Sequence, residues 1–195
     1  MTSLNPQALD QLFFQARTYH GFRNEALPAD TVAKLYDLLK WAPTAFNASP
    51  ARFVFVQSPE NKKLLCEALM QGNIAQTQQA PLTVIVASDL QFYDYLPQLF
   101  PAFDARSVFA NNPALAERAG LQNSSLQAAY LIMAARSLGL DCGPMTGFDR
   151  TALDQRFFPE GQWSSQMLVN IGYGNPDSLY PRGLRLDFAT ACRVC

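Results

Sequence analysis

The stretch from Leu126 to Ala135 is apolar on nearly every side, and it lies inside a helix predicted from Leu121 to Leu138. A helix without a polar face is buried on most of its sides. Its alanines allow neighbouring elements to approach closely, and Gly139 supplies a left-handed stop. We therefore expect this helix to lie at the centre of the fold.

The predicted start of the same helix is polar. Asn123, Ser124, Ser125 and Gln127 fall in its first turns. The first N–H groups of a helix have no partner within the helix and favour polar or anionic neighbours. We expect such a neighbour at this end.

A second informative stretch runs from Trp41 to Arg52, between a helix and a strand. The helix is indicated by an apolar stripe made of Val32, Leu35, Tyr36 and Leu39. The strand is the β-branched and aromatic run over 52–57. Between them, Pro43 and Pro50 stiffen a loop that carries Thr44, Asn47 and Ser49. This loop either binds a ligand or simply connects the two elements with locally satisfied polar groups.

The remaining segments predict a mixed α+β fold, organised as one domain over 1–195. Helices are expected over 5–16, from Ser58 to Leu69 and from Asp149 to Phe158, and strands over 81–87 and 165–171. Residues 71–79 are rich in amides and form either a solvated helix or a surface for a heterocycle. Residues 142–149 are expected to form a turn-rich loop. The aromatic segment 90–119 reads as a lid or an excursion over a partner subunit.

Composition excludes several classes of protein. The net charge of -1 provides no basic field, so nucleic acid is a poor candidate partner. Apolar residues make up 49% of the 195 residues, but their longest run is far shorter than the roughly 20 residues that span a membrane. No signal-peptide pattern follows Met1. We expect a cytoplasmic protein without a membrane partner.

The cysteine and histidine content argues against disulfide and metal chemistry. Cys192 and Cys195 match the C-x-x-C spacing, but no helix follows them to lower a thiol pKa. His20 is the only histidine, which leaves a zinc site poorly supplied with ligands. We expect no metal.

The loop from Arg17 to Arg23 combines two arginines with Thr18, His20 and a glycine. Guanidinium groups match phosphate oxygens two at a time, so this loop is a candidate phosphate cradle. The alternative is that its cations interact favourably with the negative end of a helix dipole or lie in solvent. The chain lacks a P-loop, a G-x-G-x-x-G fingerprint and a G-x-S-x-G elbow.

Taken together and in order, the loops resemble the nitroreductase family of flavin enzymes. The resemblance rests on the segments 16–22, 41–50, 139–148 and 170–174. Within the family, the phrases at 40–44, 104–107, 123–131 and 143–149 are similar to those of malonic semialdehyde reductases of bacterial pyrimidine degradation. The resemblance implies an α+β dimer with a mainly antiparallel central sheet flanked by helices, and FMN bound at the dimer interface.

The resemblance also implies roles for individual residues. Arg17, Thr18 and Arg182 would bind the phosphate and ribityl groups of FMN. Pro43, Thr44 and Asn47 would lie beside the flavin on a loop of one subunit, and Asn73 would bond its pyrimidine edge. A backbone N–H near flavin N5 would come from the segment formed by Pro144, Met145, Thr146 and Gly147.

Two departures from the family pattern concern the phosphate. Ala16 stands where the family usually has an arginine, and His20 stands where it usually has Arg or Lys. We expect His20 to act as a cation beside the phosphate.

The implied activity is ping-pong hydride transfer from NADH or NADPH through FMN to a small acceptor. For malonic semialdehyde, whose product is 3-hydroxypropanoate, the carboxylate calls for a cation, and Arg106 is our hypothesis. Two alternatives remain open: a generic nitro or quinone reductase, and a non-enzymatic flavin-binding or scaffold protein.

Overall fold

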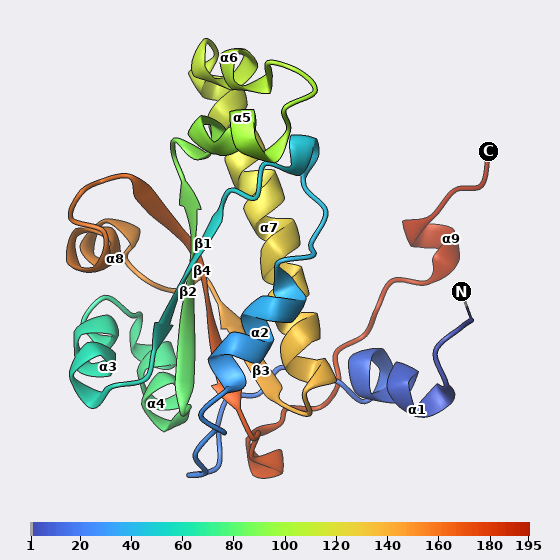
Figure 1. Ribbon diagram of the computed structural model, residues 1–195. Coiled ribbons are helices and arrows are strands. Elements are labelled where there is room, and N and C mark those ends of the chain that lie inside the picture. Colours follow the sequence, from blue (N-terminus) through green and yellow to red (C-terminus); the bar gives the residue numbers. More distant parts are fainter. Residues whose placement is uncertain (1) are drawn as a thin grey trace.

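The computed structural model describes residues 2–195 and is built around one four-stranded sheet (Figure 1). The strands are β1 (Ala51–Val56), β2 (Leu82–Asp89), β3 (Asp141–Met145) and β4 (Trp163–Gly172). Their order in the sheet is β1-β2-β4-β3, and every neighbouring pair is antiparallel. A register shift between Val86 and Ala87 interrupts the β2–β4 pairing. The expectation of a mainly antiparallel sheet flanked by helices is confirmed.

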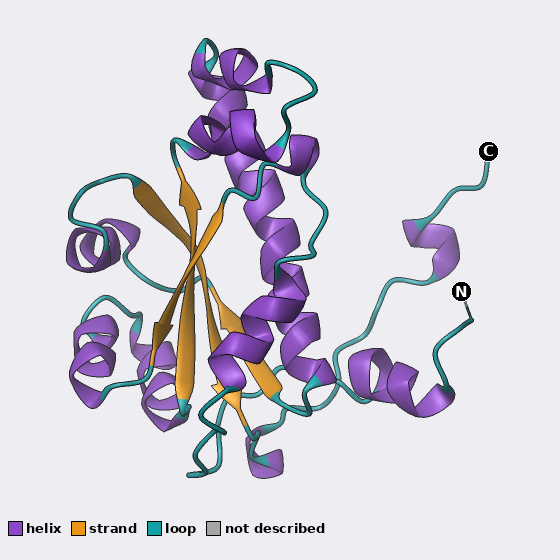
Figure 2. Cartoon of the chain, viewed as in Figure 1, coloured by secondary structure: helices purple, strands orange, loops and turns teal. Residues whose placement is uncertain are grey.

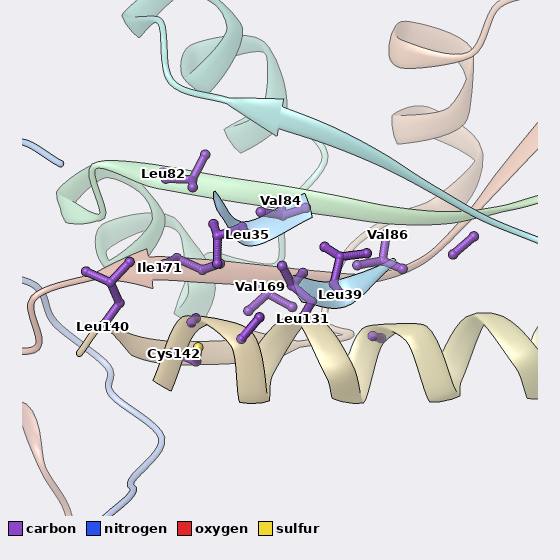
Figure 3. Packing of buried hydrophobic residues seen from close by; sticks show 14 residues of the cluster. Leu35, Leu39, Leu82, Val84, Val86, Leu131, Leu140, Cys142, Val169 and Ile171 are labelled. Atoms are coloured by element: carbon purple, nitrogen blue, oxygen red, sulfur yellow. The ribbon is translucent and has the colours of Figure 1, made fainter. Parts of the chain in front are cut away.

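Helices cover both faces of the sheet (Figures 1 and 2). One face packs against α2 (Thr31–Leu39) and α7 (Pro113–Ser137), and the other is covered by α3 (Pro59–Cys66), α4 (Gln71–Gln79) and α8 (Arg150–Phe157). Fully buried Val84, Leu131 and Val169 belong to one cluster in the layer between α7 and the sheet, where Leu131 of α7 lies beside Val169 of β4 (Figure 3). Because both faces are covered, β2 is buried along its whole length.

The central helix α7 differs from its predicted form in two ways. It begins at Pro113, with Asn112 as its N-cap, so Asn123 and Gln127 lie in the middle of the helix rather than in its first turns. Both are buried and bond backbone N–H groups of other segments, and the expected open helix start at this position is therefore wrong. The helix is also half exposed: its side away from the sheet carries Leu121, Leu126 and Tyr130.

The aromatic segment 90–119, expected to be a lid or an excursion over a partner subunit, consists mostly of short helices. After β2 come η3 (Phe92–Tyr95), α5 (Leu96–Leu99) and α6 (Ala105–Ala110). Their buried residues form a small separate core together with Ala48 and the first turns of α7. This segment is therefore a packed subregion beside the loop that precedes β1.

The two ends of the chain lie beside the main body rather than in it (Figure 1). The expected helix over 5–16 is shorter, consisting of α1 (Pro6–Leu9) and a wider π-turn, η1 (Asp10–Phe14), and its Phe13 is exposed. The C-terminal segment contains η4 (Pro176–Ser178) and α9 (Phe188–Ala191), and residues 180–195 are all exposed.

The expected loop at 142–149 is a strand over its first half. Residues 141–145 pair with β4 from Asp141↔Gly172 to Met145↔Leu168. Gly143 and Pro144 have low strand propensity. An edge strand tolerates a proline because the N–H that proline lacks would point away from the neighbouring strand. Only residues 146–149 remain a loop before α8.

Candidate functional site

The Arg17–His20 segment runs along the outer edge of β3. Thr18 forms a parallel bridge with Cys142, and the Tyr19 N–H donates to the Cys142 carbonyl at 3.0 Å. The Arg17–His20 segment thereby extends the sheet beyond β3 by one short contact. This contact fixes the position of the backbone around Tyr19. Thr18 and His20 are exposed and Arg17 is half-buried.

Two glycines make this close approach possible. A Cβ on Gly143 would lie 2.6 Å from the Tyr19 carbonyl oxygen, and one on Gly174 would lie 2.3 Å from Cδ1 of the Tyr19 ring. The Gly174 N–H donates to Asp141 Oδ2 at 3.0 Å. Burial raises the pKa of Asp141, and burial together with the Asp141 carboxylate raises the pKa of Tyr19. The Arg17–His20 segment is therefore locked between β3 and the turn after β4.

Next to this segment lies a pocket of about 230 Å³ that is lined by four arginines and no carboxylate. The arginines come from three parts of the chain: Arg17 from the N-terminal segment, Arg136 from the last turn of α7, and Arg182 and Arg185 from the C-terminal segment. The other lining residues are Ala16, Thr18, His20, Tyr180, Pro181 and Gly183. Such a concentration of unbalanced positive charge favours an anion with several oxygen acceptors.

Backbone carbonyls, rather than acidic side chains, hold these arginines in place. Arg182 Nη2 donates to the carbonyls of Phe14 (2.8 Å) and Ala16 (3.2 Å), and Arg17 Nη2 donates to the Tyr180 carbonyl. The His20 ring meets the Tyr180 ring edge-on, with centroids 5.1 Å apart. Within residues 2–195, none of the four arginines forms a salt bridge. Their charges therefore remain available to a ligand.

The loop after the C-terminal end of β3 is fixed by α4 and by Met70, which directly precedes α4. The Gly147 carbonyl accepts from the Met70 N–H (3.0 Å) and from Asn73 Nδ2 (2.9 Å), and Gln76 Nε2 donates to Asn73 Oδ1 at 2.8 Å. A Cβ on Gly147 would lie 2.6 Å from Asn73 Nδ2, so only glycine permits this contact. In the described part of the chain, the Gly147 N–H donates to no other group. It is a free donor beside the strand end.

A buried polar chain also connects α4 to the strands on the same face of the sheet. Thr83 Oγ1 donates to Asn170 Oδ1 (2.7 Å), Asn170 Nδ2 donates to Thr77 Oγ1 (3.1 Å), and Thr77 Oγ1 lies 3.9 Å from the Met145 sulfur. All three polar side chains are fully buried. A satisfied buried network rigidifies its surroundings, so the Pro144–Met145 backbone is held from below.

β3 presents backbone groups and no reactive side chain. Burial raises the pKa of the Cys142 thiol to about 12, so at neutral pH the thiolate is essentially absent. Pro144 is half-buried and Thr146 is exposed. The strand end therefore offers a surface and hydrogen-bond donors rather than a nucleophile.

The Pro43–Ser49 loop is strained, and α7 holds it. Phe46, Asn47 and Ser49 have φ values of 53°, 52° and 42°. Such left-handed conformations in residues other than glycine are sparsely populated, and they cluster at functional sites. The Ala45 N–H donates to Asn123 Oδ1 at 2.8 Å. This bond anchors the loop to the middle of α7.

Further contacts close the loop on itself and on α5. The Ser49 N–H donates to Thr44 Oγ1 (3.1 Å), and Asn47 Nδ2 donates to the Leu99 carbonyl (3.2 Å). The Phe46 ring lies 5.4 to 6.0 Å from the rings of Phe100, Phe103 and Phe109. The aromatic segment thus supports the loop from behind.

Arg106, proposed from sequence as a substrate cation, lies on α6 and already has a partner. Its Nη2 is 2.8 Å from Asp94 Oδ1, and its Nε donates to the same oxygen at 2.9 Å. Both side chains are about half exposed. A substrate carboxylate would have to share or displace Asp94.

The structure gathers the predicted residues into separate groups. Arg17, Thr18, His20 and Arg182 meet at the arginine pocket, and Asn73 meets Gly147. Thr44 instead accepts from the Ser49 N–H, and Asn47 is tied to α5 through the Leu99 carbonyl. Sequence reasoning missed Arg136 and Arg185 as pocket residues. The signal for Arg136 was its place in the last turn of a helix, where a cation usually answers the dipole.

Residues 14–173 match the sequence profile of the Nitroreductase family. This match covers most of the chain, and the protein belongs to the nitroreductase family. Its antiparallel sheet with helices on both faces is the fold of that family.

Relatives with similar sequences extend along the whole chain. A Rhodopseudomonas palustris protein named "Putative NADH dehydrogenase/NAD(P)H nitroreductase" is 55% identical over 186 residues, which is 95% of each chain. A Burkholderia lata protein whose name begins with the same words is 53% identical over 194 residues, covering 100% of both chains.

Solved structures show the same fold at low sequence identity. A Bacillus subtilis protein described as a nitroreductase superimposes with a TM-score of 0.89 at 20% identity, over 98% of this chain and 100% of the other. An Exiguobacterium sibiricum protein described as a nitroreductase in complex with FMN gives a TM-score of 0.87 at 19% identity, over 100% of both chains.

The described residues contain neither a metal-binding cluster nor a membrane-spanning helix. Between Thr2 and Cys195, His, Cys, Asp and Glu side chains form no cluster suited to a metal ion. The helices in the same range include none that is both long and apolar enough to span a bilayer.

Gly174 provides a test of how the Arg17–His20 segment is placed. We expect Gly174→Ala to destabilise the protein by about 1–3 kcal/mol and to reduce retention of FMN, because the added methyl group collides with the Tyr19 ring. Thermal unfolding and flavin content after desalting measure the two effects. Gly72→Ala is the matched control, since a Cβ there meets nothing within 4 Å. A Gly174→Ala protein with unchanged melting and flavin content would show that the Tyr19 contact does not position the segment.

Proposed function

We propose that this protein is an FMN-dependent oxidoreductase that takes reducing equivalents from NADH or NADPH and transfers them to a small acceptor. The observation that carries the proposal is the pocket with four arginines and no carboxylate, lying next to the β3 segment that leads to the free Gly147 N–H. The family, the names of the relatives and the FMN complex of the Exiguobacterium protein support it.

The residues present fit the charged end of FMN. A phosphate monoester carries between one and two negative charges near neutral pH and offers several oxygen acceptors. Arg17 and Arg182 would bind these oxygens, with Thr18 as an additional hydroxyl donor. Ala16 and His20 stand where the family usually has cations, but Arg136 and Arg185 line the same pocket.

The residues at the end of β3 fit the ring of the flavin. The edge strand offers backbone and the small residue Gly147, so a flat ring can approach closely. The Gly147 N–H is a fixed donor, and a donor placed near the ring favours added negative charge there. Bound FMN would supply the hydride chemistry itself, so the protein needs no nucleophilic side chain.

The fit also requires a second copy of the chain. Within one chain, the anchor of the Pro43–Ser49 loop at Asn123 and the arginine pocket at Arg136 are 13 residues apart on α7, or about 20 Å along the helix axis. The exposed half of α7 carries Leu121, Leu126 and Tyr130, which are 48%, 47% and 40% exposed. A dimer formed through this face would bury them. It would allow the loop of one chain to cover the flavin of the other.

For the acceptor, we propose malonic semialdehyde, with a nitroaromatic or quinone as the second candidate. The first is supported by the subgroup resemblance of four sequence phrases and by the cation of Arg106. The second is supported by the nitroreductase names of the relatives. Competition from Asp94 for Arg106 makes the semialdehyde proposal directly testable.

The function as a whole is tested by the colour of the purified protein. We expect an absorbance band near 450 nm from bound FMN that bleaches when NADPH or NADH is added without oxygen and returns with an acceptor. A protein that stays colourless after incubation with FMN, or whose colour neither nucleotide bleaches, would refute the proposal.

The acceptor is tested by paired variants. Arg106→Ala should raise KM for malonic semialdehyde about five- to tenfold and leave KM for a neutral nitroaromatic unchanged, because only the first carries a carboxylate. Asp94→Asn is the matched variant: it frees Arg106 and should lower KM for the semialdehyde. Equal effects of Arg106→Ala on both acceptors would exclude a carboxylate-binding role.

A further inference from the structure

Arg136 is the one arginine of the pocket that lies on the main body of the fold. It occupies the last turn of α7, a helix that packs against the sheet in the cluster containing Leu131 and Val169. Its Nη1 donates to the Leu12 carbonyl at 3.1 Å. Its Nε is buried and has no hydrogen-bond partner. Leaving a charged donor unsatisfied is costly, and each such group calls for an explanation.

The usual role of a cation in this position is already filled. Arginines in the last turn of a helix often bond the free carbonyl groups there. In α7, the Arg136 carbonyl instead accepts from Gln11 Nε2 at 2.6 Å and from the Gly139 N–H at 3.0 Å. The Ala135 carbonyl accepts from the Leu140 N–H at 3.0 Å. The Arg136 guanidinium is therefore not required to cap its own helix.

No acidic group neutralises Arg136 either. The described residues 2–195 contain no salt bridge to it. The charge of Arg136 acts to lower the pKa of Asp141, but that carboxylate accepts from the Gly174 N–H and forms no salt bridge with Arg136. The guanidinium faces a pocket that already contains Arg17, Arg182 and Arg185. Four like charges around one pocket repel one another, and a bound anion would offset that repulsion.

We propose that Arg136 is a direct ligand of the FMN phosphate and replaces the arginine that Ala16 lacks. This inference rests on the proposed FMN function. Arg136 reaches the pocket from α7, whereas Arg17 and Arg182 reach it from the chain's two terminal segments. The phosphate therefore links both terminal segments to the central helix through the Arg136 guanidinium.

The test compares FMN with riboflavin, which has the same ring and ribityl chain but no phosphate. The affinity of flavin-free protein for each is measured by quenching of flavin fluorescence. The readout is the dissociation constant of riboflavin divided by that of FMN, which is large when the phosphate adds affinity. Arg136→Gln should weaken FMN binding roughly tenfold or more and change riboflavin binding less than about threefold, because only FMN carries the charge. Arg156→Gln removes the same charge from an exposed arginine of α8, on the opposite face of the sheet from α7, and should leave both constants unchanged.

Each result decides one of the two proposals. Equal losses for FMN and riboflavin in Arg136→Gln would assign Arg136 a purely structural role through Leu12 and overturn the inference. If that variant does not fold, Arg136→Lys decides on the same ratio. It keeps the charge but loses the planar fork, so the ratio should fall about threefold, and an unchanged ratio overturns the inference. A wild-type protein that binds neither flavin would instead overturn the proposed function.

Discussion

The packing of α7 against the sheet is the constraint on which the rest of the structure depends. Small residues such as Ala128 and Ala135 let the helix lie close to β2 and β4, and Leu131 fills the layer between them. Close packing of this kind resists displacement of the helix. Side chains of the helix also define the candidate site, because Asn123 holds the loop before β1 and Arg136 reaches the arginine pocket.

Hydrogen bonds from buried polar groups fix the positions of the neighbouring strands and loops relative to α7 and the sheet. Gln127 Oε1 accepts from the Ala51 N–H at 2.9 Å, which fixes the start of β1 directly after the left-handed loop. On the opposite face, the Thr83–Asn170–Thr77 chain supports β3 beneath Met145. Breaking one bond of such a network leaves a buried partner unsatisfied. The strained conformation of Phe46 is therefore affordable only because its surroundings are already fixed.

Much of this could be predicted from local sequence pattern. The stripe of α2, the Ser58 cap of α3, the apolar runs of β2 and β4, and the mixed α+β class are visible without the structure. β3 was missed because Gly143 and Pro144 are typical of turns, and its pairing is decided by contacts distant in sequence. α7 begins at Pro113 because proline suits a first helical turn, although it reads equally well as a loop residue. Arg136 escaped notice because no local pattern reveals which distant segments meet it.

The central claim is that each flavin site is built from residues of two copies of the chain, so that a dimer holds two such sites. It is tested by sedimentation equilibrium recorded at 450 nm, where only flavin-bearing protein is observed. The account predicts that the absorbing species has twice the 21.6 kDa mass of one chain, with one FMN per chain. Colour that sediments with the mass of a single chain would contradict it.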